Sequence, residues 1–202
     1  MSNPVIAQHV SPNQSSLLDI SAPINAAYCK KYGFDYLKDV SLLCPNDHMI
    51  PGREKLTYII KLLKNLTDGL QVIWLDADVL IVGRESFSAA TADISMVRIY
   101  HGKNKSTEHA TRCNSGVIVM RNTKSVRDLF AAVLSGNYMT DEEGLAKCLP
   151  SSGCSFKALD PKWNCWHNNR HLVKSPNVLA FHSCHDDGKF VHLKTAAAKI
   201  IH

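Results

Sequence analysis

The sequence predicts an α/β fold in which a mostly parallel central sheet is flanked by helices. The chain opens with a strand, a helix and a second strand, an order typical of parallel, nucleotide-binding sheets. A short run rich in Val and Ile over residues 71–75 indicates a buried strand of such a sheet. Further strand-like and helix-like segments follow it. We expect a single domain over residues 1–202, because no repeat or boundary is visible.

The first half of the chain alternates strands and helices. We expect Pro23 to open the main part of the first helix and Gly33 to end it. The second helix carries its apolar residues on one side, as an amphipathic helix does. The expected segments are a strand at 4–10, a helix at 15–32, a strand at 34–37, a loop at 44–52 and a helix at 54–66.

The second half continues the alternation. Thr140 and Glu143 have the spacing of a capping box, which predicts that a short helix starts after Thr140. The expected segments are strands at 94–100, 114–122, 156–159 and 178–181, helices at 125–134 and 141–149, and a helical, alanine-rich segment in the tail, 190–202.

Composition excludes several classes of protein. Hydrophobic residues make up 45% and charged residues 20%, which is ordinary for a globular protein. The net charge of +5 suits an anionic ligand, but the basic residues are scattered, so we expect no nucleic-acid surface. No run approaches 18 apolar residues, which predicts no membrane span, and the first residues do not resemble a signal peptide. We therefore expect a cytoplasmic protein.

The seven cysteines are expected to be reduced thiols. Four of them lie in the last third of the chain, where His167 and His171 have a zinc-like spacing. No two cysteines have the gap of two to four residues that should accompany such a histidine pair, so the spacing does not favour a zinc site.

Asp76 and Asp78 are the first candidates for chemistry. They follow the buried strand 71–75 directly, and ending such a strand on two carboxylates is costly unless something offsets the charge. Ligands of open α/β sheets bind at the carboxyl ends of the strands. Two carboxylates spaced in this way can share a divalent cation, which in turn can hold a diphosphate. The pair therefore predicts a metal-dependent site for a nucleotide-linked substrate.

A phosphatase of the haloacid-dehalogenase type also begins with an apolar strand and Asp-x-Asp, the first Asp being the nucleophile. That pattern requires Gly-Thr after the second Asp, where this chain has Val79 and Leu80. In those phosphatases the Asp-x-Asp motif also lies near the N-terminus, whereas in this chain two predicted strands and two predicted helices precede it. We therefore favour the metal–diphosphate site over a phosphatase as the interpretation of Asp76 and Asp78.

Three further segments carry polar residues at the ends of elements. His182 and His185 follow the last strand, and either could complete a metal site while Lys189 binds the diphosphate. Asn114, Ser115 and Gly116 could approach a sugar through hydrogen bonds and exposed backbone, or simply form a turn before a strand.

Asp141 and Glu142 lie at the predicted start of a helix. Acidic residues are favoured there by the helix dipole alone. The alternative is that one carboxylate faces a transferred sugar.

Taken in order, these motifs resemble the glycosyltransferases with a GT-A fold, most closely glycosyltransferase family 34, the galactosyl-, mannosyl- and xylosyltransferase group. The resemblance spans residues 55–189. It rests on Lys55-Leu-x-x-Ile59, Trp74-Leu-Asp-Ala-Asp-Val-Leu-Ile81, Asn114-Ser-Gly-Val-Ile-Val-Met-Arg-Asn122, Asp141-Glu142 and Leu179-Ala-Phe-His182.

The resemblance implies a retaining transferase that uses a nucleotide-diphosphate sugar, a UDP-sugar being favoured, together with Mn²⁺ or Mg²⁺. Asp76 would contact the metal or the nucleotide ribose, and Asp78 and His182 would ligate the metal. Lys55 would contact the donor or the neighbouring acids.

The remaining site residues are also assigned by the resemblance. Asn114 and Asp141 would be the catalytic candidates, with Asp141 orienting the sugar or stabilising the developing cation. Ser115 and Gly116 would line the donor beside them.

The chain departs from the family at three points. The family has Gly three residues after its histidine, which fits His185 and not His182, although His182 is the one that ends a strand directly. Glu142 stands where the family has an amide. We also expect no membrane anchor like that of the Golgi members, and therefore a bacterial-like or viral setting.

The predicted function is therefore metal-dependent transfer of a hexose or pentose to a hydroxyl of a carbohydrate or glycoconjugate acceptor. The alternative is a protein that binds a nucleotide sugar or carbohydrate without catalysis, with which Glu142 is compatible.

Overall fold

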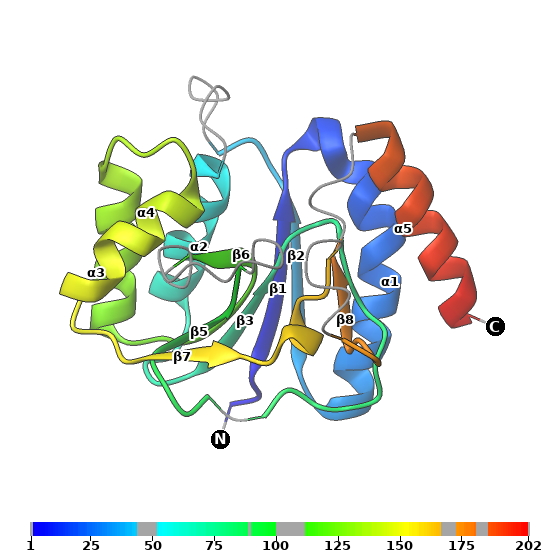
Figure 1. Ribbon diagram of the computed structural model, residues 1–202, viewed down its shortest axis with the longest axis horizontal. Helices are drawn as coiled ribbons and strands as arrows, with labels where there is room; N and C mark the ends of the chain where they lie inside the picture. The colour runs from blue at the N-terminus through cyan, green and yellow to red at the C-terminus, as the bar shows by residue number, and fades with distance from the viewer. Residues whose placement is uncertain are drawn as a thin grey trace.

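The computed structural model describes residues 2–43, 52–88, 90–99, 112–166, 173–180 and 186–201, the side chains of 186–190 and 201 excepted. A central sheet lies between two groups of helices, with α2, α3 and α4 on one side and α1 and α5 on the other (Figure 1). The helices are α1 Ser15–Tyr32, α2 Arg53–Asn65, α3 Lys124–Ser135, α4 Asp141–Cys148 and α5 Asp186–Ile201. The strands are β1 Val5–Val10, β2 Asp35–Val40, β3 Gln71–Leu75, β4 Val79–Ile81, β5 Ile94–Arg98, β6 Cys113–Arg121, β7 Phe156–Leu159 and β8 Val178–Ala180.

The main sheet has the strand order β2-β1-β3-β6-β5-β7 and is mostly parallel, as predicted. β1 pairs in parallel with β2 and β3, and β5 pairs in parallel with β7. β6 is the exception, because it is antiparallel to both β3 and β5. The start of β6 therefore lies at the edge of the sheet where β3 ends, and Leu75 pairs with Val117.

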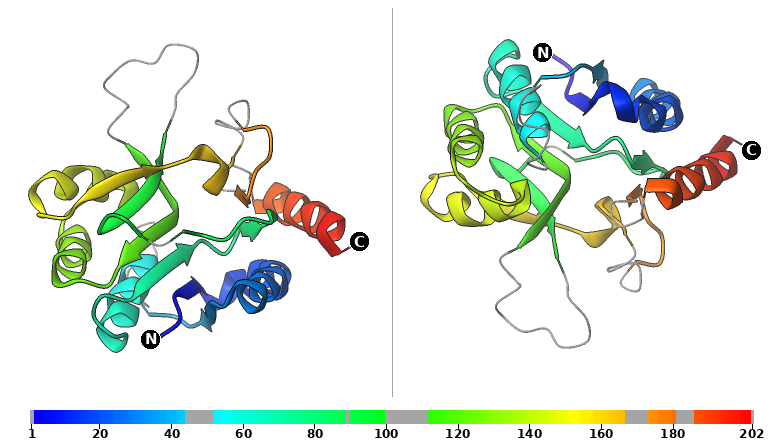
Figure 2. Two further views of the ribbon diagram at one scale, coloured as in Figure 1. Left: turned by 90° about the horizontal axis from the view of Figure 1, so that it is seen from below. Right: turned by 90° about the horizontal axis from the view of Figure 1, so that it is seen from above.

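The apolar run on the far side of Asp78 does not continue β3. It forms β4, which leaves the main sheet and pairs antiparallel with β8 in a separate two-stranded sheet. Leu80 of β4 packs with Ile24 of α1 and with Leu193 and Ala197 of α5. Figures 1 and 2 show α5 lying beside α1 as a result. The turn with the two aspartates thus joins one sheet to the other.

The two faces of the main sheet bury separate apolar clusters. On one face, Trp74 and Val72 of β3 pack with residues of α2 and α3 such as Ile59 and Phe130. On the other face, Ile73 and Leu75 pack with Tyr28 of α1 and with β4 and β8. The alternation along β3 explains why its sequence is apolar throughout: both faces are covered.

The ends of the helices follow from local sequence, with one correction. Gly33 ends α1 in a left-handed conformation, with φ of 73°, as expected. Thr140 accepts a hydrogen bond from the Glu143 backbone, the first half of the predicted capping box. Pro23 does not open the main part of α1, because the helix runs through it without interruption. Ile24 and Asn25, buried against β4, hold the chain helical past the proline.

α5 begins at Asp186, earlier than the tail segment expected from residue 190. No helix in the described residues combines the length and the apolar character required to cross a membrane.

Asn122, which follows β6, provides a test of the fold outside the cleft. Its side chain is fully buried and donates to the carbonyls of Leu63, Leu66 and Thr67, in the last turn of α2 and just after it. Asn122→Leu would leave these carbonyls without their donor, so we expect the free energy of unfolding to fall by about 2–3 kcal/mol in urea denaturation. The same substitution at exposed Asn137 should change it by less than about 0.5 kcal/mol. Equal effects at the two positions would contradict this role.

Candidate active site

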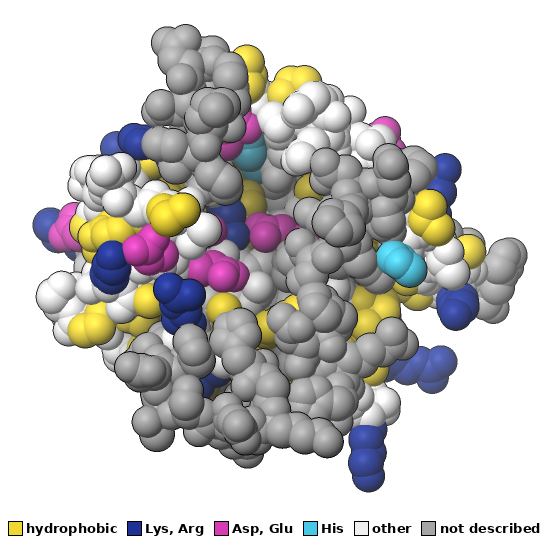
Figure 3. Space-filling model, turned by 45° about the horizontal axis from the view of Figure 1, so that its top comes forward, with side chains coloured by type: hydrophobic (Ala, Val, Ile, Leu, Met, Phe, Trp, Pro, Cys, Tyr) yellow, Lys and Arg dark blue, Asp and Glu magenta, His cyan; other side chains and the backbone are white. Residues whose placement is uncertain are grey.

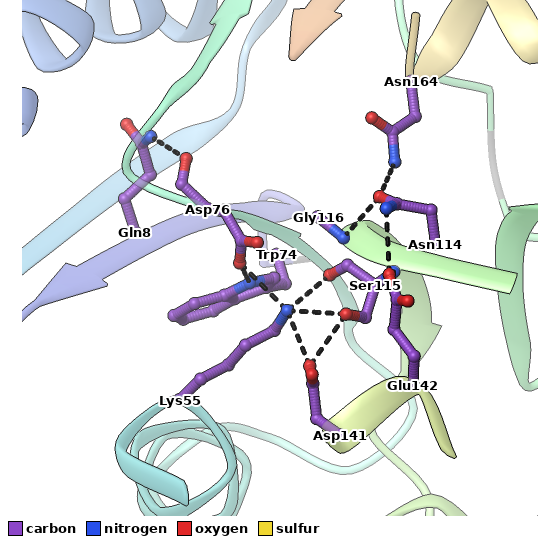
Figure 4. A network of polar contacts seen from close by, with 10 residues as sticks. All are labelled: Gln8, Lys55, Trp74, Asp76, Asn114, Ser115, Gly116, Asp141, Glu142 and Asn164. Carbon is purple, nitrogen blue, oxygen red and sulfur yellow. Dashed lines mark hydrogen bonds and ion pairs between the residues drawn. The ribbon is translucent and has the colours of Figure 1, made fainter. Parts of the chain in front are cut away.

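The turn that carries the two aspartates is held by two buried amides. Gln8, on β1, donates to the backbone carbonyl of Asp76 at 2.9 Å (Figure 4). Asn25, on α1, donates to Gln8 and to the carbonyl of Val79, and accepts from the amide of Ile81. Both amides are completely buried. They therefore fix the backbone on both sides of the turn, which limits how far Asp76 and Asp78 can move.

Asp76 lies at the end of β3 and its carboxylate is oriented by two neighbours. Its Oδ1 accepts a hydrogen bond from the indole of Trp74 at 2.7 Å and lies 3.0 Å from Nζ of Lys55. The Asp76 amide donates to the carbonyl of Gly116, across the β3–β6 pair. Asp78, two residues on, is 5% exposed. The turn thus presents one carboxylate tied to the protein and a second one, largely buried, beside it.

Lys55, in the first turns of α2, is the centre of the polar network in Figure 4. Its Nζ lies 3.0 Å from Asp76 Oδ1 and 2.9 Å from Asp141 Oδ2. It also donates to the carbonyl oxygen and the hydroxyl of Ser115, at 2.7 and 3.0 Å. The Ser115 hydroxyl in turn donates to Asp141 at 2.7 Å. One ammonium thus connects the ends of β3, α4 and β6.

The charges in this network stabilise one another. Burial alone would lower the pKa of Lys55, but Asp141 and Asp76 outweigh burial and raise it above its usual value. Burial would likewise raise the pKa of Asp141, yet the Lys55 ammonium and the hydrogen bond from Ser115 hold it below its usual range. At neutral pH the site therefore contains a protonated Lys55 and an ionised Asp141.

The start of β6 and the start of α4 are joined through Glu142. Its Oε1 accepts from the side chain of Asn114 at 2.9 Å and from the backbone amide of Ser115 at 3.2 Å. Asn114 Oδ1 accepts from the Gly116 amide and from the side chain of Asn164, at 3.0 and 2.6 Å. The Asn114–Gly116 segment is therefore neither a plain turn nor solvent-exposed, since every polar group named here is bound.

These residues line a cleft of about 1000 Å³, the size of a site for a nucleotide-sized ligand. Its walls come from the ends of β1 and β3, the segment 11–14, the N-terminal turns of α2 and α4, and the start of β6. Lys55, Asp76, Asp78, Asn114, Ser115, Gly116 and Asp141 all line it. In Figure 3 acidic side chains gather around a hollow in this face of the molecule, with basic side chains close by.

The cleft is acidic although the chain is basic. Among the described residues that line it, five are carboxylates (Glu54, Asp76, Asp78, Asp141 and Glu142) and one, Lys55, is a cation. Lys55 is already engaged by two of the carboxylates. A diphosphate entering this cleft would meet net repulsion unless a further cation came with it.

Three predicted site residues cannot be placed. His182 and His185 lie outside the described residues, as do His167 and His171, and the side chain of Lys189 does too. Within the described part of the chain, no group of three or more His, Cys, Asp and Glu side chains is arranged to hold a metal. Asp76 and Asp78 offer the oxygen ligands that Mg²⁺ and Mn²⁺ prefer.

The sequence did not single out several residues that build the site. Gln8, Asn25, Asn164 and Glu54 belong to this group, as does the indole N–H of Trp74. For Gln8 and Asn25 there was a signal, because each is a polar residue within an otherwise apolar strand or helix face. Asn164 gave none, since it follows a short turn with no pattern of its own.

The fold can be compared with solved structures. A glycosyltransferase involved in glycosylation of the major capsid of PBCV-1 superimposes with a TM-score of 0.73 over 96% of this chain and 99% of its own, at 14% identity. The galactosyltransferase LgtC, solved with donor and acceptor sugar analogues, gives 0.64 over 98% and 96%, at 13% identity. GlyE of Streptococcus pneumoniae TIGR4 gives 0.61 over 96% and 60%, at 11% identity.

This chain has the GT-A-like fold of those glycosyltransferases. The expectation drawn from its motifs is confirmed at the level of fold. No family model matches the chain, and no curated protein matches it by sequence. At 11–14% identity the likeness shows the fold alone.

Lys55→Met tests the buried charge network. It removes the cation from between Asp76 and Asp141, so we expect the free energy of unfolding to fall by about 3–5 kcal/mol at pH 7. Asp141→Asn in the same chain should restore part of this loss. Lys124→Met, which removes an exposed pair with Asp128, should cost less than about 1 kcal/mol.

The loss in Lys55→Met should also depend on pH. In the wild type the depressed pKa of Asp141 contributes stability above about pH 4, which disappears as the pH falls through its folded pKa. In the variant, buried Asp141 gains stability on protonation instead. The difference between the two proteins, measured by urea denaturation, should therefore shrink between pH 7 and pH 3. A difference independent of pH would argue against the ion pair.

Proposed function

We propose that this chain is a glycosyltransferase that moves a sugar from a nucleotide-diphosphate donor to an acceptor hydroxyl. The observation that carries the proposal is the turn Asp76–Asp78 at the carboxyl end of β3, facing Asp141 and Glu142 across a cleft of about 1000 Å³. Solved structures that share the fold over nearly the whole chain are glycosyltransferases, and one of them holds donor and acceptor sugar analogues. Donor and acceptor each require room in the cleft.

We further propose that the activity depends on a divalent metal, Mn²⁺ or Mg²⁺. The acidic lining supports this, because the described lining residues comprise five carboxylates and one ammonium, and their net negative charge disfavours a diphosphate. Asp76 and Asp78 would hold the metal, with His182, or alternatively His185, as the third ligand. When bound, the metal would supply positive charge to the diphosphate leaving group. Lys189 would add a second positive contact.

Asp141 is assigned an orienting role. Its Oδ2 is held by Lys55 and by the Ser115 hydroxyl, and its pKa is low, so it faces the sugar as a fixed carboxylate and not as a proton donor. A fixed negative charge stabilises the positive charge that develops on the sugar as its bond to phosphate breaks. Asn114 and the backbone at Ser115 and Gly116 would line the sugar on the other side.

Two details of the reaction come from the resemblance to family 34. It implies a hexose or pentose, with a UDP-sugar favoured as donor, and retention of the sugar configuration. Glu142 lies where that family has an amide, and here its Oε1 fixes Asn114 and Ser115. We propose that it shapes the acceptor side of the cleft.

Donor hydrolysis by the purified chain tests this function. With Mn²⁺ and a panel of nucleotide sugars, we expect release of free sugar from at least one donor, UDP-sugars being tried first. Asp78→Asn should lower the rate about 100-fold while the circular dichroism spectrum stays unchanged. Asp128→Asn, an acidic residue on the exposed face of α3, should have no effect. A protein that binds donors but releases no sugar would be the non-catalytic alternative.

Calorimetry with Mn²⁺ decides between the two histidines. We expect His182→Ala to weaken Mn²⁺ binding about tenfold or more, and His185→Ala to change it less than threefold, because losing one ligand of a metal site costs at least one to two orders of magnitude. A larger loss in His185→Ala would assign the ligand to that residue.

A further inference from the structure

Two buried acceptor atoms on one wall of the cleft take no part in the network around Lys55. Nε2 of His9 and Oε1 of Glu54 are both shielded from solvent, and neither has a hydrogen-bond partner in the part of the chain that the structure describes. His9, at the end of β1, is 5% exposed, and both residues line the cleft. Buried polar atoms are nearly always bonded, so two such atoms at a ligand cleft indicate groups that a ligand completes.

The ring of His9 is held in one orientation and one tautomer. Nδ1 lies 2.9 Å from Oδ2 of Asp39, and the ring stacks on Tyr58 at 4.7 Å between centroids, with the planes 11° apart. Burial lowers the pKa of His9 despite Asp39, so the ring is neutral at pH 7. Although burial opposes it, hydrogen bonds from Ser41 and His9 keep the pKa of Asp39 low, so Asp39 is a carboxylate and only accepts. Nδ1 therefore carries the proton, and Nε2 presents a lone pair.

Glu54 brings a second acceptor to the same wall. It precedes Tyr58 by four residues on α2, so the two side chains lie on one face of the helix, one turn apart. Tyr58 is the residue stacked on His9, and the charge of Glu54 acts on the His9 ring. This wall thus combines a neutral nitrogen acceptor and a carboxylate.

We propose that His9 and Glu54 select the nucleoside of the donor by accepting hydrogen bonds from its N–H and O–H groups. This inference rests on the proposed function. The shared chemistry is a hydrogen-bond donor, supplied by a base whose ring nitrogen bears hydrogen, as in uracil and guanine, or by a ribose hydroxyl. Cytosine and adenine place a lone pair on the corresponding ring nitrogen, which the lone pair on Nε2 repels. A buried site that accepts a hydrogen bond rejects analogues that lack the donor.

Calorimetry of the full chain with Mn²⁺ and UDP, CDP, GDP, ADP and 2′-deoxy-UDP tests the inference. His9→Phe keeps the ring stack on Tyr58 and removes Nε2, and Glu54→Leu keeps a side chain of similar size while removing both acceptor oxygens. Glu85→Gln, at an exposed ion pair away from the cleft, is the matched control. Urea denaturation confirms that each variant is folded.

If the base supplies the donors, the wild type binds UDP and GDP about tenfold more tightly than CDP and ADP. His9→Phe then loses about tenfold in affinity for UDP and almost none for CDP. If the ribose supplies them, 2′-deoxy-UDP binds about tenfold more weakly than UDP to the wild type, and this difference disappears in Glu54→Leu or His9→Phe. Either pattern supports the selecting role.

Unchanged affinities and preferences in both cleft variants would overturn the inference and leave the proposed function intact, since the wild type would still bind nucleotides. A folded wild type that binds none of the five would reject the proposed function, and the acceptor pair with it.

Discussion

The ammonium of Lys55 is the contact on which the architecture of the cleft depends. It is largely buried, and burying a charge is tolerated only where opposite charges and hydrogen bonds replace water. Asp76, Asp141 and Ser115 supply them, each from a different element. The position of α2 is thereby tied to the ends of β3, β6 and α4. The side-chain amides of Gln8 and Asn25 likewise hold the backbone of the neighbouring turn in place through hydrogen bonds.

The direction of β6 explains how these elements meet. In a sheet of parallel strands alone, the polar start of β6 would lie at the opposite edge from the end of β3. Because β6 is antiparallel, Asn114, Ser115 and Gly116 lie beside Asp76, and the Asp76 amide donates to the Gly116 carbonyl. Only one reversed strand in a mostly parallel sheet is required to bring a strand start and a strand end into the same site.

Much of this could be predicted from local patterns. Apolar periodicity predicted β1, α2, β3 and β6 within a few residues, and Gly33 and Thr140 marked the ends of helices through backbone conformation and capping. The role of Lys55 came from the resemblance to family 34, which implied a contact with the donor or its neighbouring acids, and Lys55 contacts Asp76 and Asp141. The features that the sequence did not predict depend on contacts between segments far apart in the chain. The apolar run after Asp78 gives no indication that it joins β8, and the continuity of α1 through Pro23 depends on packing against elements far along the chain. Gln8 and Asn25 lie 17 residues apart, and nothing short of the fold reveals that they meet.

The buried charge network has a consequence for how such chains diverge. Loss of Lys55, Asp76 or Asp141 singly leaves a charge without its counterpart in the interior, so each substitution passes through a less stable protein. A descendant that lacked the proposed activity would still be under selection to keep all three, because they stabilise the fold. The presence of these three residues in a distant homologue would therefore indicate common ancestry and a need for stability. Catalytic activity has to be judged from residues that do not stabilise the fold.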